Sequence, residues 1–290
     1  MTGELDPARV LRDFLGVGRD DAFEAEILLA NHWTAHLLVA ERYRDGRVFL
    51  AGDSAHQFVP TGGYGMNTGV GDAVDLGWKL GAVLNGWGGE RLLDSYEAER
   101  RPVAFRNREA SREHVRTRAR IAALYAAEPA LDDDGHEGEN ARRRLGQAIA
   151  EIGNAENECW GIEHGYRYTG SPVIPQAVAD EAFDPLVYQP STSPGARLPN
   201  VPTGGGRSLF SRLGDGFTLV VVGSQDLTNL ATSARDAGVP LTIVEIDDDF
   251  DAVFQDAIVL VRPDHHIAWS GSASPEDWSP VLAVATGRRP

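Results

Sequence analysis

The chain has 290 residues, a length that allows one large domain or two ordinary ones. It is 42% hydrophobic and 24% charged, which is typical of a folded protein and unlike a disordered one. Because 43 acidic residues outnumber 27 basic ones, the formal net charge is −16, which disfavours nonspecific binding to nucleic acid or to an anionic membrane surface.

Cysteine content and hydropathy exclude further classes of protein. The single cysteine, Cys159, excludes an internal disulfide and a dithiol redox pair. No apolar run approaches the ~20 residues that cross a bilayer, and the first residues do not resemble a signal peptide. These features predict a cytoplasmic protein.

The first part of the chain is predicted to begin with a helix and to continue in short strands. Mixed three- and four-residue spacing of apolar side chains predicts a helix over residues 4–20, with Asp6-Pro7 as its start. Partial alternation of apolar and polar residues predicts three strands, which are Phe23–Leu29, Trp33–Ala40 and, after an Asp45-Gly46 turn, Arg47–Ala51.

In the middle of the chain, apolar residues recur at the spacing that is typical of helices. One helix is predicted from about Asn67 to Leu84, after a glycine-rich loop. A longer helix is predicted from about Arg91 to Ala127, with an interruption at Pro102 because proline lacks the backbone donor of a helix. The segment Asp132–Gly135 indicates a break, and a further helix is expected from about Asn140 to Asn154.

The last 80 residues have a different pattern, after a segment rich in Pro, Gly and Ser over 170–206 that predicts a linker. The predicted elements are a strand Phe217–Val222, a helix Leu227–Ala237 closed by Gly238, a strand Leu241–Ile246, a hairpin of Ala257–Val261 and Ile267–Trp269, and a helix Pro275–Val284. The order β-α-β and then β-β-α predicts an α/β module with a mixed sheet, because the crossover needs parallel strands and the hairpin antiparallel ones.

The glycine-rich loop after Arg47–Ala51 contains the candidate ligand-binding residues. Asp53 follows a predicted strand, so its carboxylate lies at a sheet edge and can accept hydrogen bonds from ribose hydroxyls. Glycines 62, 63 and 65 remove Cβ atoms where a flat ligand would lie against the main chain. The helix that starts near Asn67 would present free N–H groups and a positive dipole to an anionic or electron-rich group.

Residues 46–79 resemble the second FAD-binding motif of the class A flavoprotein aromatic hydroxylases, the p-hydroxybenzoate hydroxylase and phenol hydroxylase family. The matching pattern is R-V-F-L-A-G-D-x-A-H, then P-x-G-G-x-G-x-N-T-G, then D-A-x-x-L-x-W-K-L. Tyr96–Pro102 is also similar to the helix that follows this motif in the family. The resemblance implies an FAD- and NAD(P)H-dependent monooxygenase that hydroxylates a phenolic or polyketide aromatic substrate.

The same resemblance implies roles for individual residues. The implied cofactor-binding residues are Gly52, Asp53, Gly63, Gly65, Met66 and Asn67. Asp53 would bind the ribityl or ribose hydroxyls of FAD, and the main chain from Gly65 to Asn67 would line the isoalloxazine. Pro60 is the one position given a catalytic place, through its backbone beside flavin C4a.

The resemblance continues to the end of the chain. Gly195–Pro199, Ser208–Phe210, Gly216–Leu219 and Leu260–Trp269 look like the thioredoxin-like C-terminal domain of the phenol hydroxylase branch, here without a C-x-x-C pair. The expected fold is therefore α/β, with the C-terminal part of a flavin monooxygenase FAD/substrate domain followed by a thioredoxin-like domain. The expected domains are 1–169, a linker at 170–206, and 207–290.

One family motif is missing from the sequence. Members open with a G-x-G-x-x-G motif for the FAD pyrophosphate, but Gly16-Val-Gly18, Gly63-Tyr-Gly65 and Gly69-Val-Gly71 each lack the third glycine. The resemblance thus covers only the C-terminal half of the family's architecture. We expect a homodimer or pairing with a missing N-terminal half. The alternatives are a catalytically inactive truncated or split chain that acts as a dimerisation or partner module, and a small-molecule binder without redox chemistry.

Other conspicuous residues favour structural interpretations. His56 is expected to pack in the loop near the flavin, and His265-His266 to be solvent-exposed. His32 and His36 lie in a strand-like run without an intervening Glu, so no metal site is expected. The arginines between 100 and 120 alternate with glutamates, which is typical of a solvated helix face.

Overall fold

The computed structural model describes most of the chain, as two compact units that are considered separately. The described residues are 6–18, 21–31, 33–153, 158–176, 183–203, 206–223, 225, 227–246, 253–254 and 256–288. The units are Met1–Ala35 and His36–Pro290. Among the described residues, no helix combines the length and the apolar character needed to cross a membrane.

The first unit contains helix α1 (Pro7–Leu15). Asp6 caps this helix, because its carboxylate accepts a hydrogen bond from the backbone of the first turn, where Pro7 also lies. The predicted start is confirmed. The helix ends earlier than predicted because Gly16 follows it in the left-handed conformation, with φ 66°.

The strand predicted at Phe23–Leu29 is wrong, since residues 21–31 contain no regular element. Their apolar side chains do not form a buried sheet face, and the Leu28 side chain is 84% exposed. A strand needs a neighbouring strand to pair its backbone N–H and C=O groups. Local alternation of side chains cannot supply that neighbour.

Two small antiparallel pairs begin the second unit. Their bounds are β1 (Leu38–Val39) with β4 (His56–Gln57), and β2 (Arg44–Asp45) with β3 (Val48–Phe49), and the 3-10 helix η1 (Gly52–Ser54) lies between β3 and β4. The β2–β3 hairpin turns at Gly46, whose φ is 56°. The strands predicted at Trp33–Ala40 and Arg47–Ala51 are therefore only two residues long each, because only two residues of each stretch pair with a neighbouring strand.

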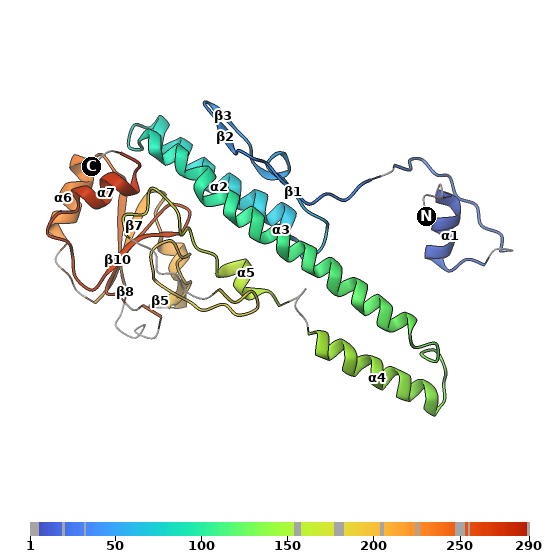
Figure 1. Cartoon of the computed structure of the whole chain (residues 1–290). Helices are drawn as coiled ribbons and strands as arrows, with labels where there is room; N and C mark the ends of the chain where they lie inside the picture. Colours follow the sequence, from blue (N-terminus) through green and yellow to red (C-terminus); the bar gives the residue numbers. More distant parts are fainter. Residues whose placement is uncertain are drawn as a thin grey trace. The chain divides into compact units, whose positions relative to one another are not determined.

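Two long helices, α2 (Tyr64–Leu84) and α3 (Glu90–Ala126), pack against each other (Figure 1). Helix α2 begins before the predicted Asn67, because Gly63 adopts a left-handed conformation and starts the helix there. Helix α3 is continuous through Pro102, so the predicted interruption is wrong. Buried residues on both sides of Pro102, including Arg100 and Val103, hold the helix against its neighbours.

The second unit then continues through α4 (His136–Ile152) and the short helix α5 (Trp160–His164). The break predicted at Asp132–Gly135 is confirmed, and α4 begins directly after it. Arg142 stabilises this turn by donating hydrogen bonds to the carbonyl oxygens of Leu131 (2.7 Å) and Asp133 (3.0 Å).

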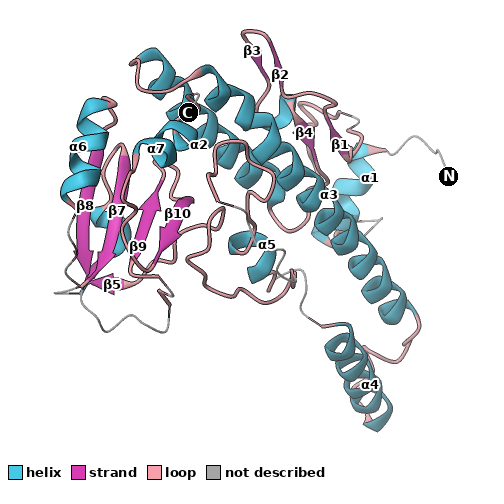
Figure 2. Cartoon of the chain, turned by 60° about the vertical axis from the view of Figure 1, so that its left-hand side comes forward, coloured by secondary structure: helices cyan, strands magenta, loops and turns pink. Residues whose placement is uncertain are grey.

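A four-stranded mixed sheet forms the C-terminal part of the second unit (Figure 2). Its strands are β7 (Phe217–Val222), β8 (Leu241–Ile246), β9 (Ile258–Val261) and β10 (Ile267–Gly271), in the order β10-β9-β7-β8. Strand β7 pairs parallel with β8 and antiparallel with β9, with Leu219 opposite Ile243 on one side and Leu260 on the other. The predicted α/β module with a mixed sheet is confirmed.

Apolar side chains cover both faces of this sheet. Helices α6 (Thr228–Asp236) and α7 (Ser279–Ala285) contribute Leu230 and Leu282 to one face, and side chains from residues 198–203 and 206–213 cover the other. Short elements in the latter two segments are β5 (Pro202–Thr203), β6 (Arg207–Ser208) and η3 (Leu209–Arg212). Trp78 and Trp87 each lie 6.1 Å from the Phe217 ring, so aromatic packing joins the α2 region to the sheet.

Candidate functional site

The corner at Gly52 lies directly against helix α2. Gly52 has φ 60°, a conformation that suits glycine, and it starts η1. A Cβ atom built on Gly69 of α2 would lie only 3.1 Å from the Cα of Gly52. The absence of side chains at both positions therefore lets the corner that carries Asp53 approach the helix.

A buried carboxylate, that of Asp72, holds this contact together. It accepts hydrogen bonds from the Gly52 N–H (3.1 Å), from His56 Nε2 (3.0 Å) and from Arg100 Nε (2.8 Å). Burial by itself raises the pKa of Asp72, but the His56 hydrogen bond and the Arg100 charge outweigh burial and lower it. His56 is buried and hydrogen-bonded inside the protein, which confirms the packing part of the prediction for it.

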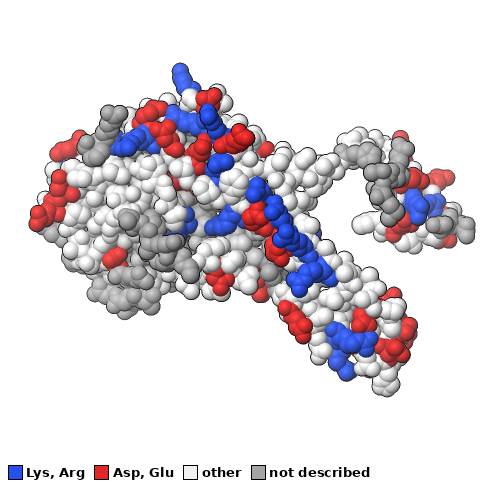
Figure 3. Space-filling model, in the orientation of Figure 1, with Lys and Arg blue, Asp and Glu red and all other residues white. Residues whose placement is uncertain are grey.

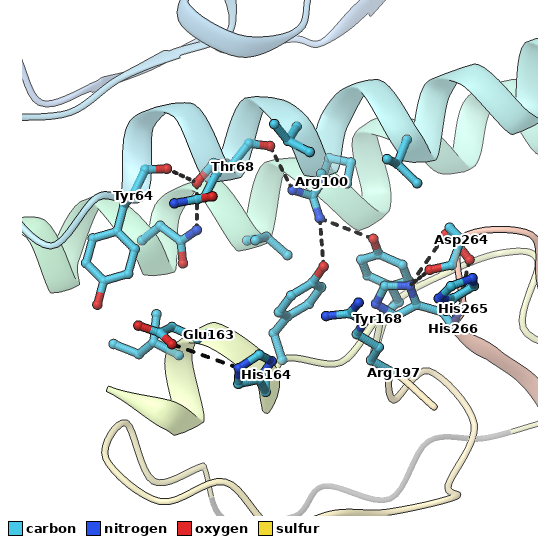
Figure 4. Close-up of a pocket in the computed structure, with 18 of the residues that line it drawn as sticks. Tyr64, Thr68, Arg100, Glu163, His164, Tyr168, Arg197, Asp264, His265 and His266 are labelled. Carbon is cyan, nitrogen blue, oxygen red and sulfur yellow. Dashed lines mark hydrogen bonds and ion pairs between the residues drawn. The ribbon is translucent and has the colours of Figure 1, made fainter. Parts of the chain in front are cut away.

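Arg100 extends this network to the first turns of α2 (Figure 4). Its guanidinium donates to the Thr68 carbonyl oxygen (3.2 Å) and to the hydroxyls of Tyr168 (3.2 Å) and Tyr166 (3.4 Å). Asn107 donates to Thr68 Oγ1 at 2.8 Å. Sequence reasoning did not single out Asp72 or Arg100, although both lie in the stretches that resemble the hydroxylase family.

The N-terminus of α2 is open to a ligand. No side chain caps the helix at Gly63, and its first turn holds no acidic residue, so the N–H groups of Tyr64, Gly65 and Met66 have no side-chain partner. The preceding Gly62 has φ 68°, and a Cβ atom there would lie 2.4 Å from His114 Nδ1. Glycine is therefore required for this approach to the helix.

The predicted site residues surround this corner and helix start. Asp53, Pro60, Gly63, Met66 and Asn67 are exposed, whereas Gly52 and Gly65 are half-buried. The Asp53 side chain makes no hydrogen bond or ion pair with a described residue, while the Asn67 amide donates to the Gly63 carbonyl oxygen at 2.9 Å. The unbonded carboxylate fits ribose or ribityl hydroxyls, and the uncapped N–H groups fit the electron-rich edge of a flavin.

A second buried cluster links α2 and α3 to the turn between β9 and β10. Arg262 contacts Glu99 at 2.6 and 2.8 Å, and Asp75 at 3.0 Å. Lys79 contacts the same two carboxylates at 2.5 and 2.7 Å. Asp75, Glu99 and Asp264 are close enough together to hold a metal ion, but Arg262 forms ion pairs with all three carboxylates and Lys79 with two of them. The cluster is an internal ionic contact.

Several minor predictions can also be compared with the structure. His265-His266 is not solvent-exposed, because His266 is 3% exposed and stacks on Tyr168, and His265 is half-buried. His36 is exposed, whereas His32 lies outside the described residues. Figure 3 shows basic and acidic side chains together along α3, as expected for a solvated face, with ion pairs such as Arg112–Glu109. Arg100 is the buried exception.

Two family models match this chain. An "FAD binding domain" model matches residues 4–111, which include the Gly52 corner and the start of α2. An "Aromatic-ring hydroxylase, C-terminal" model matches residues 191–288, which include the mixed sheet.

Curated relatives match nearly the full length of the chain. "FAD-dependent monooxygenase apdD" of Emericella nidulans is 35% identical over 98% of this chain and 48% of its own length. "2,4-dichlorophenol 6-monooxygenase" of Cupriavidus pinatubonensis is 32% identical over 97% of this chain and 52% of its own length. The chain thus spans about half the length of the curated relatives it matches.

Solved structures agree with these matches. The rebeccamycin biosynthetic enzyme RebC with reduced flavin has a TM-score of 0.81 at 35% identity, over 100% of this chain and 53% of that one. A ternary complex of aklavinone-11 hydroxylase with FAD and aklavinone has a TM-score of 0.69 at 28% identity, over 98% and 51%. The chain therefore belongs to the family of FAD-dependent aromatic-ring monooxygenases.

Proposed function

We propose that this chain forms the C-terminal half of an FAD- and NAD(P)H-dependent enzyme that hydroxylates a phenolic or polyketide aromatic ring. The proposal rests on the uncapped N-terminus of α2 and on the nearby Asp53 carboxylate, which makes no hydrogen bond or ion pair with a described residue. Relatives named for dichlorophenol and aklavinone substrates support the aromatic substrate class.

The predicted residues have distinct roles in this proposal. Asp53 accepts hydrogen bonds from ribityl or ribose hydroxyls, and the Gly52 corner sets its position. Gly63, Gly65, Met66 and Asn67 present main chain to the isoalloxazine, and the exposed Pro60 precedes them beside its reactive face.

Reduced FAD, when bound, supplies the electrons that activate oxygen for transfer of one atom to the aromatic ring. The protein's own contribution is electrostatic. The N–H groups of Tyr64, Gly65 and Met66, together with the positive end of the α2 dipole, stabilise negative charge on a group held at the helix start. Gly62 permits the close approach, because no Cβ atom fits beside His114.

An exposed apolar face of α2 supports association with a nucleotide-binding half. Met66, Val70 and Val74 are 76%, 56% and 50% exposed, whereas polar Asp72 and Lys79 point into the protein. This distribution is the reverse of an ordinary surface helix, and it indicates that another protein surface covers the apolar side. The same face favours the second candidate function, a catalytically inactive dimerisation or partner module.

The visible absorption spectrum of the purified chain tests FAD binding. We expect a bound, perturbed flavin spectrum after incubation with FAD and desalting, and a loss of bound flavin in Asp53→Ala. The matched control is Asp45→Ala, which removes another exposed carboxylate from the β2–β3 hairpin. A colourless wild-type chain would refute FAD binding by these residues alone.

Turnover and mass measurements then separate the two candidates. NAD(P)H oxidation coupled to hydroxylation of an aromatic compound, with the flavin-loaded chain, would reject the inactive-module alternative. A dimer or a complex with a separate nucleotide-binding chain, measured by light scattering and without turnover, would favour that alternative.

A further inference from the structure

The second half of helix α3 and helix α4 form a hairpin within the second unit. Figure 1 and Figure 2 show this hairpin, residues 108–152, extending away from the mixed sheet. Helix α4 packs against α3, and its Leu145 side chain is 7% exposed. None of the residues assigned to FAD lies in the hairpin.

One side of α3 in this hairpin is apolar and exposed. Four exposed apolar residues recur there at three- and four-residue spacing, namely Val115, Ala119, Ala122 and Ala126. They lie on the side of the helix opposite the buried Thr117, and the Val115 side chain is 41% exposed. A helix that packs with one side ordinarily carries polar residues on the opposite side. The apolar side of α3, defined by these four residues, therefore indicates that a second protein surface covers it.

The first part of the hairpin is basic. Residues 108–120, the basic segment, contain five arginines and two glutamates. Glu109 pairs with Arg112 at 2.9 Å, whereas Arg120 forms no ion pair with a described residue. The segment thus has an excess of positive charge in a protein whose net charge is −16 (Figure 3).

The far end of the hairpin is acidic. Residues 121–141 contain no arginine or lysine and six acids, which are Glu128, Asp132, Asp133, Asp134, Glu137 and Glu139. Glu128 pairs with Arg144 at 2.7 Å. The three aspartates and Glu137 are exposed and form no ion pair with a described residue. This acidic segment, residues 128–139, is therefore opposite in charge to the basic segment and has groups available for a partner.

We propose that the apolar side of α3 binds a second copy of this chain, with the two α3 helices packed antiparallel about a two-fold axis near Ala122. The surface lies outside the FAD site and outside the apolar face of α2. The dimer therefore goes beyond the proposed function and forms whether or not the chain binds FAD.

The charges determine the antiparallel direction. With Ala119 opposite Ala126 of the other copy, the basic segment of each copy lies beside the acidic segment of the other. A parallel pair would instead bring the two basic segments together, which is unfavourable. Alanine side chains let the helix axes approach to about 8 Å. The net charge of each copy opposes association only weakly, because salt at about 0.15 M screens charges that are more than about 8 Å apart.

Sedimentation of the full chain over about 1–100 μM tests the dimer. We expect a monomer–dimer equilibrium that weakens about tenfold or more when NaCl is raised from about 0.05 to 0.5 M, because salt screens the paired segments. Two charge variants locate the interface, and they are Arg112→Glu with Arg116→Glu, and Asp132→Lys with Asp134→Lys. Each variant alone should dimerise at least about tenfold more weakly, because like charges then face each other.

An equimolar mixture of the two charge variants should dimerise again, because every contact between the segments then joins opposite charges. The matched control is Arg42→Glu with Arg47→Glu, which makes the same change in net charge at two exposed arginines beside the β2–β3 hairpin. It should leave the dimer unchanged.

A cross-link provides a readout that does not depend on the charge variants. Because Cys159 is buried, Ala122→Cys introduces an accessible thiol, and a short bismaleimide should join two copies through it. Ser211→Cys, at an exposed position over the mixed sheet, should not be joined.

Three outcomes would overturn the proposal. These are a monomer at about 100 μM, a dimer that Arg112→Glu with Arg116→Glu leaves unchanged, and a mixture of the charge variants that stays monomeric. Circular dichroism checks that the variants fold, and the Ala122→Cys cross-link decides the matter if a charge variant does not. A failure to bind FAD would refute the proposed function and leave this result intact.

Discussion

Replacement of Asp72 by Asn should destabilise the protein and release the Gly52 corner from α2. The carboxylate accepts three hydrogen bonds, from Gly52, His56 and Arg100. The amide keeps a single acceptor oxygen and turns an NH₂ group toward the other donors. Removal of one partner from a buried ion pair costs about 3–5 kcal/mol, because the remaining charge is left buried without compensation. We expect a loss of that size for Asp72→Asn.

Two measurements check this prediction. Urea unfolding gives the free energy of unfolding, and hydrogen exchange reports whether the amides of residues 51–57 open more readily than those of the mixed sheet. The control is Asp94→Asn, which breaks an ion pair with Arg44 at the surface and should cost less than about 1 kcal/mol. A loss below about 1 kcal/mol for Asp72→Asn, or unchanged exchange at the corner, would refute the role assigned to Asp72.

Two further predictions concern pH and the start of α2. The folded-state pKa of Asp72 is lowered, so its stabilising contribution is present above the unfolded value of about 3.9 and is lost as the pH falls through the folded value. The stability difference between the unaltered chain and Asp72→Asn should therefore shrink below about pH 4 in unfolding titrations, and a constant difference would contradict this. Gly62→Ala should cost about 1–3 kcal/mol and reduce FAD retention, because φ is 68° and the added Cβ meets His114. Gly77→Ala, where a Cβ meets nothing within 4 Å, should instead stabilise α2 by up to about 1 kcal/mol in thermal unfolding, and equal effects of the two changes would count against the steric explanation.

The sequence alone determined those features that depend on neighbours in the chain. The strand-like stretches Phe217–Val222 and Leu241–Ile246 predict β7 and β8 at their observed residues, and Gly238, with φ 65°, closes α6 as predicted. The motif over residues 46–79 also indicates the family by itself, because its glycines and acids follow one another in a single continuous stretch. These signals are local, because strand propensity, helix termination and a motif's glycines act over a few consecutive residues.

Tertiary structure decided the features that depend on residues far apart in the chain. Asp72 and Arg100 became recognisable as site residues only when packing brought them to Gly52 and His56. The same packing keeps α3 continuous through Pro102.

The burial of His265-His266 and the failure of Phe23–Leu29 to form a strand likewise depend on residues elsewhere in the chain. His266 is buried because Tyr168, almost 100 residues earlier in the sequence, stacks on it at 4.1 Å. The residues at 23–29 alternate like a strand but pair with no strand in the described part of the chain, so they form none there. Burial of charge, and of the backbone groups of a sheet, is favourable only when a partner from elsewhere in the fold compensates it, and a linear pattern does not contain that partner.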